Sequence, residues 1–110
     1  MAGRGTDTRG GTVRHAAKVD VNHGKIRDGL RDVFGRDAVQ DVSMYPRLGF
    51  DLIAYVRGRV YFLEVKQPRK ATQLTEAEDD ARKRFPGVWH VVTTIEEALE
   101  LVAPGRQSPL

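Results

Sequence analysis

Two acids and a lysine flank a pair of apolar runs in the middle of this 110-residue chain. Asp51 is the second residue of the run 50–56, while Glu64 and Lys66 stand at the end of the run that begins at residue 59. Two carboxylates brought to one point suit a hard divalent cation, because such cations prefer oxygen ligands. An ammonium beside them can orient an attacking water or stabilise developing negative charge. Whether these groups meet depends on how the two runs pair.

The runs 50–56 and 59–65 predict a β-hairpin that turns at Arg57-Gly58. Glycine fits the second turn position, where a tight hairpin requires a positive φ. Both faces of the hairpin are apolar, which is typical of strands in the middle of a sheet that is covered on both sides. One face carries Ile53, Tyr55, Val60 and Phe62, and the other carries Leu52, Ala54, Tyr61 and Leu63.

The predicted turn fixes the register of the three chemical residues. It places Asp51 across from Glu64, with Cβ atoms about 4.5–5.5 Å apart, where the two charges repel unless a cation separates them. Lys66 lies two residues beyond Glu64 and therefore on the same strand face. A slip of one residue would send Asp51 to the opposite face. Taken alone, Glu64-Val65-Lys66 is also a common kind of sequence at the end of a strand without any function, but the opposed Asp51 favours a functional interpretation.

The remaining periodicity predicts the elements that flank the hairpin. A helix from Asn22 to Phe34 has Asn22 as its N-cap, and capping boxes at Thr75 and Thr94 open two further helices. Short strands are expected at Val39–Met44 and Val88–Val92. The predicted class is α/β, a mixed central sheet flanked by helices in the order α-β-β-β-α-β-α.

Composition indicates one small domain. We expect a flexible basic arm over 1–18, a folded domain over 19–102 and a disordered tail over 103–110. The chain has no Cys, which excludes a disulfide scaffold and a thiol nucleophile. No apolar run is long enough to span a bilayer and no secretory signal is present, so a cytoplasmic protein is the expectation.

Positive charge is concentrated in two parts of the chain. Residues 1–36 carry eight Lys or Arg against four Asp, and residues 57–70 carry five against the single Glu64. Residues 76–100 reverse the sign, with seven acids and three bases. This asymmetry suggests a face for a polyanion, although solvated surfaces without a partner explain the charge alone equally well. The pair Arg69-Lys70 follows the predicted site and favours the polyanion.

The segment Gly49-Phe50-Asp51-Leu52-Ile53, a hairpin and then Phe62-Leu63-Glu64-Val65-Lys66 resembles the signature of the PD-(D/E)XK nucleases. The resemblance extends over about residues 20–102, and the layout is similar to that of small stand-alone VRR-NUC and Holliday-junction-resolvase-like proteins of phages and bacteria. It implies a restriction-endonuclease-like core and a bacterial or phage-infected host cell. It also implies that Asp51, Glu64 and the Val65 carbonyl bind Mg²⁺ or Mn²⁺ and that Lys66 is the catalytic lysine.

Two departures from the family pattern concern the site. Phe50 stands where the family has Pro, a position that often varies. Related proteins often carry a Glu on the first helix that reaches the metal, and the segment 22–26 has none. His23 or Asp28 is a possible substitute, although a surface role is the more common one for each.

The resulting expectation is a Mg²⁺-dependent endonuclease that selects branched or Holliday-junction-like DNA and acts as a homodimer without a membrane. Its predicted nucleic-acid contacts are Arg69, Lys70, Gln73, Lys25, Arg14 and Lys18, and Gln73 is equally well explained as a plain loop residue. The alternative is a nucleic-acid-binding protein on the same fold with little or no activity. A weaker third idea is an accessory domain that binds a partner through the acidic residues 76–80, although acids at a helix start have a dipole explanation.

Overall fold

In the computed structural model the backbone is described for residues 14–105 and the side chains for residues 21–105. The order of the long elements, α-β-β-β-α-β-α, is as predicted. They are α1 (Arg14–Phe34), β1 (Val39–Asp41), β2 (Leu52–Val56), β3 (Arg59–Val65), α2 (Glu76–Arg84), β4 (Trp89–Val92) and α3 (Ile95–Val102). Three 3-10 turns join them: η2 (Arg36–Ala38), η3 (Pro46–Leu48) and η4 (Pro68–Lys70).

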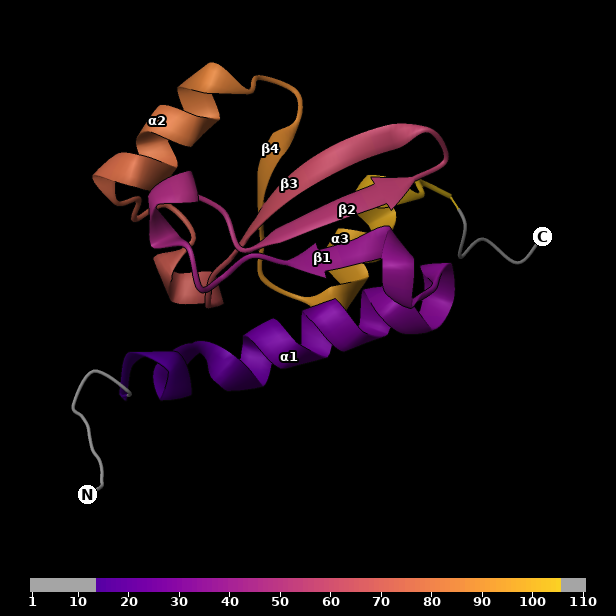
Figure 1. The fold of residues 1–110 in the computed structure, drawn as a ribbon, viewed down its shortest axis with the longest axis horizontal. Helices are drawn as coiled ribbons and strands as arrows, with labels where there is room; N and C mark the ends of the chain where they lie inside the picture. Colours follow the sequence, from indigo (N-terminus) through magenta and orange to yellow (C-terminus); the bar gives the residue numbers. More distant parts are fainter. Residues whose placement is uncertain (1–13, 106–110) are drawn as a thin grey trace.

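The four strands form one mixed sheet in the order β1-β2-β3-β4. The pairs β1–β2 and β2–β3 are antiparallel, whereas β4 runs parallel to β3 after the crossover through α2. The helices cover the sheet from its two sides, with α1 and α3 on one and α2 on the other (Figure 1). The fold is therefore a small α/β structure with a four-stranded mixed sheet.

The β2–β3 hairpin has the predicted turn and register. Val56 pairs with Arg59 and Leu52 pairs with Leu63. Arg57 and Gly58 have φ values of 57° and 79°, the left-handed conformation that a two-residue hairpin turn requires at both positions. The tight turn therefore determines which residues of β2 and β3 lie at the open end of the hairpin.

Only one face of the hairpin is covered along its whole length. The covered face joins the helices α1 and α3 in the main core, whose fully buried side chains include Ile26, Leu30, Leu52, Leu63, Val92 and Val102. On the other face Phe62 packs in a second cluster with Phe50, Ala81 and Trp89. Tyr55 and Val60 on that face are exposed, so the prediction of two covered faces is wrong near the turn. The helix α2 has nine residues and packs only over the open end.

Several predicted boundaries were also wrong. The first helix begins at Arg14, eight residues before Asn22, because residues 14–21 contain no Gly or Pro to stop it. It therefore takes up part of the expected arm, while residues 1–13 lie outside the described part of the chain. At the other end, Ala103 is buried and its amide donates to the Leu99 carbonyl, so the domain extends past residue 102.

The strand predicted to reach Met44 stops at Asp41. Asp41 Oδ1 accepts hydrogen bonds from the Ser43 amide and hydroxyl, at 3.0 and 2.7 Å, and this local bonding turns the chain out of the sheet. Within the described residues, no helix is both long enough and apolar enough to cross a membrane.

Candidate functional site

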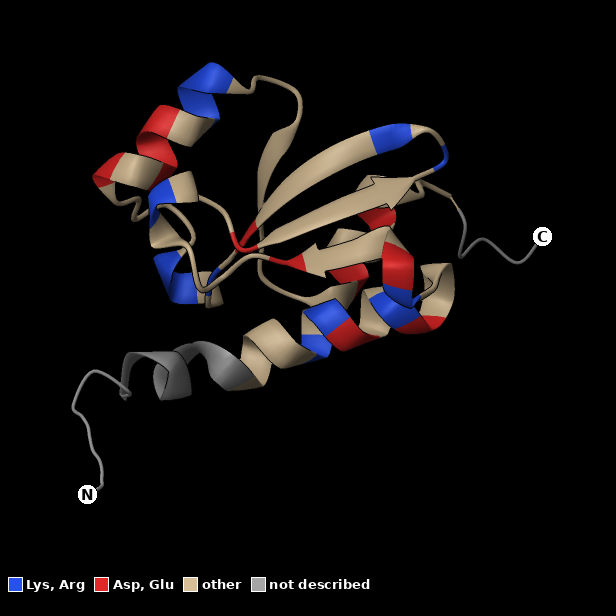
Figure 2. Cartoon of the chain, in the orientation of Figure 1, with Lys and Arg blue, Asp and Glu red and all other residues tan. Residues whose placement is uncertain are grey.

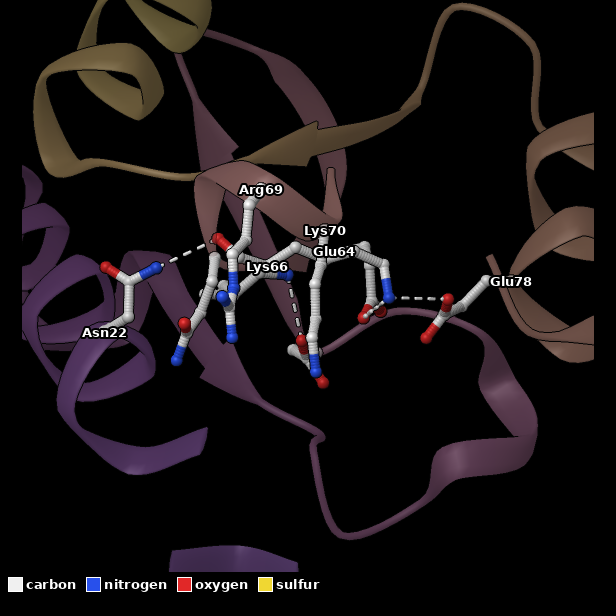
Figure 3. Close-up of a pocket in the computed structure, with 9 residues that line it drawn as sticks. Asn22, Glu64, Lys66, Arg69, Lys70 and Glu78 are labelled. Atoms are coloured by element: carbon white, nitrogen blue, oxygen red, sulfur yellow. Dashed lines mark hydrogen bonds and ion pairs between the residues drawn. The ribbon is translucent and has the colours of Figure 1, made fainter. Parts of the chain in front are cut away.

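A pocket of about 500 Å³ opens where the hairpin strands end, opposite the turn. Its walls come from α1, β3, η4, α2 and the residue before β2 (Figure 3). The residues that line it are Asn22, Asp51, Glu64, Val65, Lys66, Gln67, Arg69, Lys70 and Glu78. The structure thus brings together all four residues predicted for the metal and the chemistry, along with Arg69 and Lys70.

Asp51 lies just beyond the last regular pair of the hairpin. Its amide donates to the Leu63 carbonyl at 2.8 Å, so the backbone does not continue the facing pattern that the sequence predicted. Its carboxylate Oδ2 instead accepts a hydrogen bond from the Val65 amide at 2.9 Å. This bond holds the carboxylate against the end of β3, beside Glu64.

Glu64, Lys66 and Glu78 form a buried charged cluster. The Lys66 ammonium lies 3.7 Å from Glu64 Oε2 and 2.9 Å from Glu78 Oε1. The side chains of Glu64, Lys66 and Glu78 are only 8%, 14% and 12% exposed. Figure 3 shows both interactions as dashed lines that converge on the ammonium.

The sequence predicted Glu78 only as a helix cap and as part of an acidic face. The capping box is present, since the Glu78 amide donates to Thr75 Oγ1 at 3.2 Å and Glu78 Oε1 accepts from the Thr75 amide at 2.9 Å. The same carboxylate also binds Lys66, and this contact depends on where the crossover places α2. Capping signals locate a residue along its helix, but they carry no information about what the first turn faces.

The electrostatics of the pocket favour protonated acids when no cation is bound. Burial raises the pKa of Glu64 to about 9, and the neighbouring Asp51 charge and Glu78 add to the effect. Burial also raises the pKa of Asp51, against the lowering effect of the Val65 amide. Burial opposes the ionisation of Glu78 too, but the hydrogen bonds from Lys66 and the Thr75 amide hold its pKa below the ordinary value. A bound cation would relieve the repulsion between Asp51 and Glu64.

The oxygen atoms available to a cation are few but of the right kind. Within residues 21–105, no three His, Cys, Asp or Glu side chains form a group that could hold a metal ion. Asp51 and Glu64 nevertheless offer two carboxylates. The Val65 carbonyl should project to the Asp51 side as well, because the amide and carbonyl of one strand residue point to the same side. Mg²⁺ commonly binds through one or two carboxylates and keeps water or phosphate as its other ligands, so this set fits it.

The first helix contributes Asn22 to the pocket and no acid. Asn22 lies inside α1, so its predicted role as N-cap is wrong. Its side-chain nitrogen donates to the carbonyls of Lys66 and Thr93, both at 3.0 Å, and this ties together the chain segments that follow β3 and β4. Asn22 is therefore the residue through which the described part of the first helix lines the pocket.

The two residues considered as substitutes for that Glu lie elsewhere. His23 is buried, contrary to the surface role favoured from the sequence, and its Nε2 lies 3.0 Å from Asp41 Oδ2. Asp28 is exposed and pairs with Arg27 at 2.9 Å. Neither residue lines the pocket.

The predicted nucleic-acid contacts fall into three groups. Arg69 and Lys70 are exposed at the mouth of the pocket on η4, where blue and red segments meet in Figure 2. Gln67, which the sequence did not single out, lines the pocket beside them. Gln73 and Lys25 are exposed but do not line it. The side chains of two further candidates, Arg14 and Lys18, lie outside the described residues.

No protein-family profile matches the chain, and neither a characterised protein nor a solved structure shows significant similarity to it. We therefore infer a function from the geometry and chemistry of the pocket.

Proposed function

We propose that the protein is a metal-dependent nuclease that hydrolyses phosphodiester bonds in DNA, on a restriction-endonuclease-like core of the PD-(D/E)XK type. The observation that carries the proposal is the meeting of Asp51, Glu64 and Lys66 in one pocket with a basic mouth. Three charged groups are withdrawn from water there, at a position where the sheet itself does not require them. Perturbed ionisable groups in a cleft are typical of functional sites.

Each residue has a role that follows from its position. Asp51 and Glu64, with the Val65 carbonyl, would hold Mg²⁺ or Mn²⁺. A bound cation of this kind supplies an activated water and stabilises negative charge on phosphate oxygens. Lys66 presents an ammonium beside the two acids and can stabilise charge that develops on a phosphate.

The mouth of the pocket suits the backbone of a nucleic acid. Arg69 and Lys70 can bind phosphates, and such contacts position a nucleic acid without reading its sequence. We therefore propose selection of DNA shape, with branched or Holliday-junction-like DNA as the substrate and single-strand nicking as the competing mode. Each chain contributes one set of Asp51, Glu64 and Lys66, so paired cuts at a junction require a homodimer. The mass of the protein in solution tests this last point.

Cleavage assays with plasmid, branched and single-stranded DNA in Mg²⁺ or Mn²⁺ test the proposal. We expect Asp51→Asn and Glu64→Gln each to lower the cleavage rate about 100-fold or more, since each removes a carboxylate that would hold the cation. Glu100→Gln removes an exposed acid on α3 and serves as the matched control. Undiminished cleavage by the Asp51→Asn protein would show that the activity does not come from this pocket.

A second candidate function is DNA binding without cleavage. Asn22 in place of a first-helix acid favours it, as does the absence of a three-residue metal group within residues 21–105. This function predicts salt-sensitive DNA binding that is the same with and without Mg²⁺. Calorimetric titration with Mn²⁺ separates the two candidates. Binding that disappears in Asp51→Asn supports the nuclease, and no binding by the wild type supports the second candidate.

A further inference from the structure

The Lys66 ammonium lies between two carboxylates and is closer to the one on α2. It is 2.9 Å from Glu78 Oε1 and 3.7 Å from Glu64 Oε2. Attraction between charges rises as their separation falls, and it is stronger in a partly buried site than in water. The main partner of Lys66 is thus Glu78, which is not one of the acids expected to bind a metal.

Glu78 is held in place by bonds that are independent of Lys66. Its carboxylate accepts from the Thr75 amide, and its own amide donates to the Thr75 hydroxyl. The first turn of α2 also packs closely against the loop before Asp51, because the Ala77 carbonyl lies against the α-carbon of Gly49. The negative charge of Glu78 is therefore fixed at the pocket by the fold of α2.

Lys66 would have a different partner without this charge. The ammonium sits on a flexible four-carbon stem, and the nearest remaining carboxylate is Glu64. An ion pair between Lys66 and Glu64 would compete with a cation for the same carboxylate. The crossover helix thus supplies a charge that can prevent this competition.

We infer that Glu78 is a positioning residue, which holds the Lys66 ammonium closer to itself than to Glu64 so that Glu64 remains available to a divalent cation. The inference rests on the proposed function, because the role of Glu78 presupposes that Glu64 binds a cation. The contact between Lys66 and Glu64 is present in the metal-free protein as well and can be measured there. Glu78 contacts neither a substrate nor a reacting atom in this scheme. It also hydrogen-bonds the Glu64 side chain directly, and the second test below separates that contact from the route through Lys66.

The first test measures the interaction between Lys66 and Glu64 in metal-free protein. A double-mutant cycle with Lys66→Met and Glu64→Gln, followed by urea unfolding, gives their coupling energy. We expect the coupling to be small in the wild type and to increase severalfold in the Glu78→Gln background. Gln at this position preserves the capping box, because it can still accept from the Thr75 amide. Equal coupling in the two backgrounds would overturn the inference, whatever the protein's activity.

The second test measures Mn²⁺ affinity by calorimetry. We expect Glu78→Gln to weaken binding about tenfold, a typical effect for a residue that supports a metal ligand. Adding Lys66→Met to Glu78→Gln should restore affinity to within about twofold of Lys66→Met alone, because the competitor is gone. If Glu78→Gln weakens binding equally with and without Lys66, Glu78 acts only as a nearby charge and the inference is wrong.

A control separates this role from helix capping. Thr75→Ala removes the hydroxyl of the capping box but leaves the Glu78 carboxylate, so it should lower stability and leave Mn²⁺ affinity unchanged. A loss of affinity in Thr75→Ala equal to that in Glu78→Gln would reduce Glu78 to a structural cap. Absence of Mn²⁺ binding by the wild type would instead overturn the proposed metal site, and the metal-free cycle would still decide the role of Glu78.

Discussion

The two ends of the β2–β3 hairpin are formed by the same two strands and differ in what they bury. At the turn end, Tyr55 and Val60 face each other across the strands and are 61% and 40% exposed. At the open end, Glu64 is buried and Lys66 is largely enclosed. The hairpin thus leaves apolar groups in water at one end and withdraws charged groups from water at the other, against the usual preference of both kinds of side chain.

This difference shows that the strand pairing of the hairpin does not itself require charged residues at the open end. The strand pairing is complete from Val56 with Arg59 to Leu52 with Leu63, so the charged residues lie beyond the last regular pair. Burying a charge is unfavourable unless the group is well paired. A local departure from the rules that stabilise the rest of the structure is typical of a functional site. The open end is therefore where we expect substitutions to separate stability from function.

The largest expected effect is on the free energy of unfolding, and it should differ between a glycine at one end of the hairpin and a glycine at the other. Gly49 and Gly58 have similar φ values, 83° and 79°, but only Gly49 is enclosed. A Cβ on Gly49 would collide with the Ala77 carbonyl and lie 2.8 Å from Ala81 Cβ, whereas one on Gly58 would meet open space. We expect Gly49→Ala to cost about 3–5 kcal/mol in the free energy of unfolding. Gly58→Ala should cost about 1–2 kcal/mol, since only the backbone strain remains.

Urea unfolding of the two variants measures this difference directly. Similar losses at the two positions would mean that α2 does not pack tightly against the loop before Asp51. The support inferred for Glu78 would then be weaker, because the same packing fixes the first turn of α2.

The next effect concerns the pH dependence of stability without metal. The pKa of Glu64 is raised from 4.5 to about 9, so between these values the folded protein holds a proton that the unfolded chain has lost. Stability from this group is fully present below about pH 4.5 and is lost as the pH rises towards 9. Asp51, whose pKa is also raised, acts in the same direction. The pKa of Glu78 is lowered, so its contribution is lost only at acidic pH, below this window.

Thermal unfolding between pH 5 and 9 tests this prediction, with ~1 pH unit between samples. Glu64→Gln should flatten the pH dependence, because its side chain does not titrate. Arg59→Gln lies at the turn end of the same strand and should preserve the wild-type slope, since arginine stays charged throughout this range. An unchanged slope in Glu64→Gln would contradict the raised pKa of this buried carboxyl.

A smaller effect is expected on DNA binding, and it should differ between the basic residues at the two ends of the hairpin. Arg69→Gln with Lys70→Gln removes two positive charges at the pocket, and Arg57→Asn with Arg59→Gln removes two at the turn. We expect the first pair to weaken DNA binding and to reduce the slope of log affinity against log salt by about 1 for each lost phosphate contact. The second pair should leave that slope nearly unchanged. Equal losses from both pairs in a fluorescence titration would point to general charge attraction.

The open end of the hairpin was predictable from the sequence to the extent that local signals define it. Arg57-Gly58 fixes the register as far as Leu52 with Leu63, so counting from the turn places both acids at the open end, although Asp51 does not pair directly with Glu64. The capping signal likewise placed Glu78 at the third position of α2. These features depend on backbone geometry over a few residues, which a sequence records directly.

The rest of the site depends on contacts between distant segments. Asn22 is predicted as a helix cap because Asn favours that position. In the structure α1 begins before Asn22, and the Asn22 side chain donates to carbonyls 44 and 71 residues away. His23 reads as a surface residue because its partner, Asp41, lies in another element. The choice of Lys66 between Glu78 and Glu64 is likewise set by the position of α2. Periodicity and capping patterns contain no information of this kind.

The smallest expected effect concerns the exposed pair at the turn end. Tyr55→Thr and Val60→Thr place a β-branched side chain at each site, so each should cost less than about 1 kcal/mol, the usual range for an exposed cross-strand pair. Leu63→Ala, at a fully buried position of the same strand, should cost about 2–5 kcal/mol. Urea unfolding at several protein concentrations makes the comparison. A loss above about 2 kcal/mol at Tyr55 that grows with protein concentration would mean that a second copy covers this face. The homodimer would then form through the turn end and leave both pockets open to DNA.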